Sequence, residues 1–141
     1  MKLATRKAVG ISAQRRLQLQ SARAGAPVLR DRFPQVSALR IELRFEERGG
    51  ITPSPQQHTL YPAARAFFRF ACPCAECDGD FDLSPAIAAV LEPAKATARG
   101  GDRAVSGHLA CEGWRARERA SGRPCTIELH YRLSVGAANQ D

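Results

Sequence analysis

The chain is predicted to fold as an α+β domain: a small, mostly antiparallel four-stranded sheet with one short helix. Three observations support this. Residues 38–46 and 125–133 alternate strictly between apolar and polar side chains, as half-buried strands do. Residues 83–92 carry the start signals of a short helix. Five cysteines recur beside the ends of the predicted strands, so a four-cysteine cluster is expected at one end of the sheet.

Four segments are predicted to be strands. In 38–46 (ALRIELRFE) the apolar residues occupy alternate positions and the arginines and glutamates lie between them. The segment 125–133 (CTIELHYRL) repeats this pattern, and 64–72 and 103–111 carry weaker versions of it. Residues 47–63 are rich in Gly, Pro, Ser and Gln, so a long connection without regular structure is expected there.

The short helix is predicted over 83–92. Ser84 is a suitable N-cap, Pro85 suits the first helical position, and three apolar residues at helical spacing would share one face. This helix is expected to lie on the inner face of the sheet. It would carry the chain back, so that strand 103–111 runs in the same direction as strand 64–72.

The net charge of +7 is concentrated at one end of the sequence. Residues 1–32 hold eight Lys or Arg against Asp31 alone, whereas the remaining residues are balanced. We therefore divide the chain into a basic N-terminal arm (1–33), partly helical or disordered, an α+β domain (34–134) and a polar tail (135–141). Residues 12–24 are predicted to form a helix that is marginal in isolation, because its apolar stripe is thin.

A basic arm of this kind is typical of chains that contact a polyanion. A solvated tail and a cleavable targeting peptide are the two alternatives. A second basic segment follows Cys111, where a tryptophan precedes several arginines; an aromatic ring can stack on a base while arginines contact phosphates. The predicted nucleic-acid contacts are Lys2, Arg6, Lys7, Arg15, Arg16, Arg23, Trp114, Arg115, Arg117 and Arg119.

The cysteines predict a structural zinc site. Their number is odd and no secretory signal is evident, which argues for free thiols in a reducing compartment and against a disulfide framework. Four thiolates around one ion form the usual closed structural zinc site. The ligands are expected to be four of Cys72, Cys74, Cys77, Cys111 and Cys125, with Cys72 and Cys74 competing for one position.

The motifs CPCAECDG, CEG and GRPC resemble the cysteine turns of zinc-ribbon and zinc-knuckle domains at the level of the broad class. That resemblance implies a zinc-ribbon-like site of four cysteines at the end of the sheet. The chain departs from the pattern because thirteen residues separate Cys111 from Cys125, where ribbons usually have two. Buried apolar cysteines, a redox-active Cys-x-x-Cys pair and an iron–sulfur cluster remain alternatives, as does His108 in place of one cysteine.

The expected function is that of a zinc-stabilised binding module contacting RNA, DNA or the ribosome through the basic arm. The alternative is a protein–protein adaptor with a structural zinc site. No catalytic constellation or phosphate-binding loop is evident, so an enzyme with a small-molecule substrate is not expected. No apolar run approaches the ~20 residues of a membrane span, and a cytoplasmic location is expected.

Overall fold

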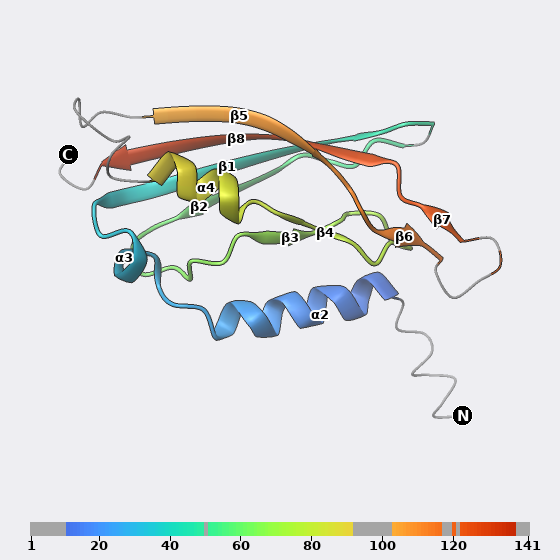
Figure 1. Cartoon of the computed structure of the whole chain (residues 1–141), viewed down its shortest axis with the longest axis horizontal. Helices are drawn as coiled ribbons and strands as arrows, with labels where there is room; N and C mark the ends of the chain where they lie inside the picture. Colours follow the sequence, from blue (N-terminus) through green and yellow to red (C-terminus); the bar gives the residue numbers. More distant parts are fainter. Residues whose placement is uncertain (1–10, 50, 92–102, 117–119, 121, 138–141) are drawn as a thin grey trace.

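The computed structural model describes residues 11–49, 51–91, 103–116, 120 and 122–137. Its main element is a four-stranded sheet in the order β2-β1-β8-β5, in which every neighbouring pair is antiparallel. Figure 1 shows the two long central strands crossing the molecule side by side. The strands are β1 (Val36–Glu47), β2 (Gln56–Leu60), β5 (Arg103–Ala110) and β8 (Ile127–Ala137). The predicted fold class is confirmed.

The two segments with the cleanest alternation form the centre of the sheet. β1 and β8 pair along their lengths, with Ile41 opposite Leu133 and Phe45 opposite Leu129. These four side chains are buried, whereas the residues between them face the other side of the sheet. Period-two alternation puts all apolar side chains of a strand on one face, so both strands bury the same face.

A second layer covers this buried face. It contains α4 (Ser84–Leu91) and a short ribbon of β3 (Arg69–Ala71) and β4 (Asp80–Asp82). Phe81 of β4 packs against Phe45 of β1, with ring centroids 6.1 Å apart. Figure 1 shows β3 and β4 between the sheet and α2 (Ile11–Ala24), so the core lies between the sheet and this ribbon.

The predicted short helix is present, but its cap differs from the prediction. Ile87, Val90 and Leu91 of α4 are buried, as their spacing predicted. The helix begins at Ser84, whose backbone N–H donates to Oδ1 of Asp82 at 2.9 Å. Asp82 therefore supplies the capping oxygen in place of Ser84, since a carboxylate accepts this hydrogen bond strongly.

The segment 64–72 differs most from the prediction. Only Arg69–Ala71 is a strand, and it pairs with β4 instead of joining the four-stranded sheet. Residues before it pair elsewhere: the N–H of Leu29 donates to O of Ala64 at 2.7 Å, and the N–H of Ala66 donates to O of Pro27 at 2.7 Å. Residues 64–72 therefore do not join the four-stranded sheet, contrary to the prediction. β3 and β5 nevertheless run in the same direction, as predicted, since Cys72 and Cys111 follow them and converge at one end.

The fourth strand of the sheet is β2, which lies within the segment predicted as a long connection. Its sequence QQHTL shows no apolar alternation, and its side chains are partly or fully exposed because it forms an edge of the sheet. At the other end of the chain, β8 continues to Ala137, past the expected start of the tail. Residues 92–102, which connect α4 to β5, lie outside the described residues.

The N-terminal helices contact the domain. Leu29 of α3 (Leu29–Arg32) is fully buried in the core, and Leu19 of α2 is 6% exposed while Leu17 is 60% exposed. Two short strands, β6 (Trp114–Arg115) and β7 (Arg123–Pro124), extend the end of the molecule where the cysteines lie. Within the described part of the chain, no helix has the length and apolarity needed to cross a membrane.

Candidate metal centre and basic groove

Four of the five cysteines converge at one end of the structure. Cys72 follows β3, Cys77 precedes β4, Cys111 follows β5 and Cys125 precedes β8. Their four sulfur atoms lie within 4.8 Å of one another, with Cys72 Sγ 3.8 Å from Cys125 Sγ and Cys77 Sγ 3.6 Å from Cys111 Sγ. All four are buried, so the cluster has the composition and dimensions of a four-thiolate metal centre.

The local turn separates Cys72 from Cys74. The backbone N–H of Cys72 donates to O of Gly79 at 3.1 Å, which holds Cys72 beside Cys77 across the base of the turn. Cys74 lies partly exposed and outside the converging group, although its carbonyl accepts the N–H of Cys77 at 3.4 Å. The geometry thus selects the pair with a four-residue gap over the shorter Cys-x-x-Cys pair.

Each half of the cluster contains a Cys-x-Gly turn that supplies a donor to sulfur. The N–H of Gly79 donates to Cys77 Sγ at 3.2 Å, and the N–H of Gly113 donates to Cys111 Sγ at 3.3 Å. The two turns lie against each other, so a Cβ at Gly113 would be 2.5 Å from N of Gly79 and 2.7 Å from Cys77 Sγ. Glycine is needed here for close backbone approach.

Replacing Gly113 by alanine is expected to destabilise the protein by about 2 kcal/mol, because the added methyl group forces the two turns apart. The matched control is Gly25→Ala, where the nearest atom to the new Cβ is 3.8 Å away. Denaturant unfolding of the metal-loaded variants measures both effects. Equal stability of the two variants would contradict the close approach of the turns.

The thiols cannot all ionise without a cation. Hydrogen bonds from Cys72 and Cys77 lower the pKa of Cys111 to about 5. The pKa of Cys72 is raised, first by its hydrogen bonds to Cys111 and Cys77 and then by burial, and the pKa of Cys77 is raised first by Cys111. One thiolate therefore forms readily and suppresses its neighbours, whereas a divalent ion would remove this repulsion.

Arg115 lies beside the cluster in a buried ion pair. Its side chain is 9% exposed, and Nη2 is 2.8 Å from Oε1 of Glu47, which also accepts the Thr126 hydroxyl at 2.9 Å. The arginine lowers the pKa of Glu47; in turn Glu47, and to a smaller extent Cys125, raises the pKa of Arg115. Arg115 was expected to contact phosphate, but in the structure it pairs with Glu47 and lies beside Cys125 of the cysteine cluster.

The other predicted contact residues divide into three groups. Arg15 and Trp114 both hold the turn after Cys77 through Asp78. Nε of Arg15 donates to the carbonyl oxygen of Asp78 at 3.0 Å, and the backbone N–H of Trp114 donates to Oδ1 of Asp78 at 2.8 Å. Arg16 and Arg23 are exposed on α2. Those that lie outside the described residues are Lys2, Arg6, Lys7, Arg117 and Arg119.

Arg16 and Arg23 border a groove, which we call the basic groove. It has a volume of about 470 Å³ and lies between α2, β2 and β3, beside Cys72. Its lining includes Arg16, Gln20, Arg23, His58, Arg69 and Phe70. The sequence did not reveal His58 and Arg69 as part of this site, because neither the strand β2 nor the packing of α2 on β3 was predicted.

The groove combines positive charge with aromatic surface. Within the lining, the His58 ring packs on Phe70 with ring centroids 5.0 Å apart. Arg23 also lies 5.7 Å from the ring centroid of Phe67, which is not among the lining residues. Burial, followed by the charge of Arg23, lowers the pKa of His58, so this imidazole is neutral near pH 7. A neutral ring can both donate and accept a hydrogen bond.

Comparisons of the chain with protein-family models, with curated proteins and with solved structures gave no match. The resemblance to zinc-binding domains therefore depends on the chain's own residues: four buried cysteines whose sulfur atoms lie within metal-binding distance of one another.

Proposed function

We propose that this protein is a zinc-stabilised binding module that contacts nucleic acid through its basic arm and the basic groove. The observation that carries the proposal is the position of the groove directly beside the cysteine cluster: Cys72 and Pro73 form part of its lining. A metal at the cluster would fix the floor of the groove, and α2 supplies its charged wall.

Zinc is supported by the donor set. Four thiolates match the composition of closed structural zinc sites, and the two N–H groups that donate to sulfur stabilise thiolate charge. A four-thiolate zinc centre carries a net negative charge, and the buried guanidinium of Arg115 lies next to Cys125, where it would offset part of that charge.

Nucleic acid is supported by the charge of the groove. Arg69 is paired with Asp80 at 2.8 Å, so the excess positive charge comes from Arg16 and Arg23. The described residues that line the groove include no carboxylate. Arginines of this kind contact phosphates, and the partly exposed ring of His58 in the lining offers a surface near which a base can lie. Residues 1–10 add Lys2, Arg6 and Lys7 to the same basic arm.

The test is fluorescence anisotropy with labelled single-stranded and double-stranded RNA and DNA over a range of salt concentrations. The variant Arg16→Gln/Arg23→Gln is expected to bind at least about tenfold more weakly, and its log–log salt slope should be smaller by about 2, since two phosphate contacts are lost. The matched control is Arg40→Gln/Arg132→Gln, which removes the same charge from exposed positions on the opposite face of the sheet.

Equal losses in the two variants would show that total charge, and not the groove, governs binding. Salt-insensitive binding, or no binding to any of the four nucleic acids, would contradict the proposal. A protein–protein adaptor is then the alternative: pull-downs from nuclease-treated lysate would retain a partner, and that partner would be lost from the Arg16→Gln/Arg23→Gln variant.

A further inference from the structure

We propose that the outer face of the four-stranded sheet carries a second metal site, formed by Glu46, Glu128 and His130, for an exchangeable divalent transition-metal ion. This site is separate from the cysteine centre. Its ligands are carboxylate oxygens and an imidazole nitrogen on the central strands β1 and β8.

The three side chains converge because of the strand register. Glu46 and Glu128 are direct partners across β1 and β8, and His130 lies two residues beyond Glu128 on the same face. Nε2 of His130 is 3.2 Å from Oε1 of Glu46 and 3.3 Å from Oε1 of Glu128. One ligand atom from each residue lies within 4.8 Å of the other two, which matches the ligand spacing around a single ion.

The arrangement brings two carboxylates close together, with only partial compensation from the exposed Arg44. Two like charges directly opposite each other across a strand pair destabilise the pairing. Nε2 of His130 is shielded from solvent yet, within the residues that the structure describes, makes no contact with hydrogen-bond geometry. A single metal ion between the three groups would both neutralise the carboxylates and bind Nε2 of His130.

The ligand types indicate the class of ion. Imidazole and carboxylate suit zinc, nickel, cobalt and manganese, whereas a site of oxygen atoms alone would suit calcium or magnesium. Three protein ligands leave coordination positions for water, and the side chains of Glu46 and Glu128 are 52% and 42% exposed. The ion is therefore accessible and exchangeable, unlike one enclosed by four buried cysteines.

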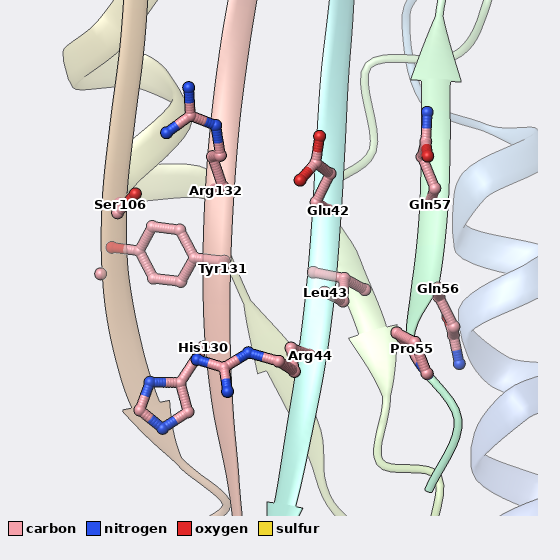
Figure 2. A pocket seen from close by; sticks show the side chains of 11 residues that line it. Glu42, Leu43, Arg44, Pro55, Gln56, Gln57, Ser106, His130, Tyr131 and Arg132 are labelled. Carbon is pink, nitrogen blue, oxygen red and sulfur yellow. The ribbon is translucent and has the colours of Figure 1, made fainter.

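Two neighbouring groups modify the site. Nη1 of Arg44 is 3.1 Å from Oε2 of Glu46, and Figure 2 shows Arg44 reaching from β1 toward β8, near His130 at one end of a hollow on this face. Its guanidinium competes with a metal for Glu46, although the exposed pair is weak. His108 of β5 is the cross-strand partner of His130, with ring centroids 5.8 Å apart, but its nitrogens do not belong to the converging group.

In the experiment, the full chain is first loaded with one equivalent of zinc. The loaded chain is then titrated calorimetrically, in one experiment with zinc and in another with cobalt. A second equivalent is expected to bind. Cobalt there should give the weak absorption of nitrogen and oxygen ligands, without the thiolate-to-cobalt charge-transfer bands of the cysteine centre. Glu128→Gln and His130→Gln should each weaken this second equivalent at least about tenfold. Arg44→Gln should strengthen it.

The matched control is Glu42→Gln, which removes a carboxylate from the same face of β1 outside the cluster. It should leave the second equivalent unchanged, and thermal unfolding should confirm that all four variants are folded. A stoichiometry of one metal per chain would overturn the proposal. So would a second equivalent that Glu128→Gln and His130→Gln leave intact, or one that Glu42→Gln weakens equally. Because the cysteine centre is filled beforehand, failure here leaves the proposed function unaffected.

Discussion

Replacing Cys72 by serine is expected to abolish stable zinc binding, whereas Cys74→Ser is expected to retain one zinc ion per chain. Cys72 is fully buried within the converging group, and Cys74 lies outside it. A hydroxyl is a poor substitute for a thiolate ligand, and loss of a structural metal is among the few single changes that cost about 4 kcal/mol or more. Destabilisation should concentrate at β3, β4, β6 and β7, which the cysteines connect.

The measurement combines metal content after gel filtration with chemical denaturation in the presence and absence of a chelator. The wild type and Cys74→Ser should both lose stability when the chelator is added. Without chelator, Cys72→Ser should already be only as stable as the chelator-treated wild type. Cys111→Ser tests the same centre by removing the cysteine of the other Cys-x-Gly turn. Zinc retained by Cys72→Ser but lost by Cys74→Ser would contradict the assignment of Cys72, and not Cys74, to the metal-binding cluster.

Replacing Arg115 by leucine is expected to destabilise the protein by about 3 kcal/mol, because it leaves the carboxylate of Glu47 buried without its partner. The double variant Arg115→Leu/Glu47→Leu should recover much of that loss, since both charges are then absent. Arg44→Leu is the matched control: its pair with Glu46 is exposed, with side-chain exposures of 63% and 52%, and should change stability by about 1 kcal/mol or less.

The ion pair also predicts a pH dependence. Arg115 lowers the folded-state pKa of Glu47 below its ordinary value of 4.5, so the stabilisation is fully present above that value. It is lost as the pH falls through the lowered folded-state pKa. Urea unfolding of the wild type and Arg115→Leu between pH 7 and strongly acidic pH should therefore converge in acid, where Glu47 is neutral in both proteins. A constant difference across that range would show that Glu47 does not titrate in this way.

The sequence pattern was sufficient to predict an element where apolar residues repeat at a regular spacing along it. The alternation in 38–46 and 125–133 predicted β1 and β8 and the face that each buries, and the apolar spacing in 83–92 predicted α4. It was insufficient for β2, because an edge strand made of QQHTL carries little apolar signal. It also misassigned 64–72, whose backbone pairs with residues 27–29 and with β4.

The candidate sites were likewise predictable from the sequence only in part. The basic arm and the set of five cysteines were evident from residue type, but Arg69 and His58 join Arg16 and Arg23 only because α2 packs on β3. Arg115 could not be distinguished by sequence from the arginines that follow it. Its burial depends on Glu47, which lies 68 positions away in the chain.

The sequence by itself thus determined the α+β class, the two central strands, the charge asymmetry and the presence of a four-cysteine cluster, because these depend on local periodicity and composition. Tertiary structure alone decided that Cys72 and not Cys74 joins the cluster, that Arg115 is buried, and that Glu46, Glu128 and His130 meet on the outer face. The physical reason is that each of these depends on strand register and turn geometry, which bring together residues far apart in the chain.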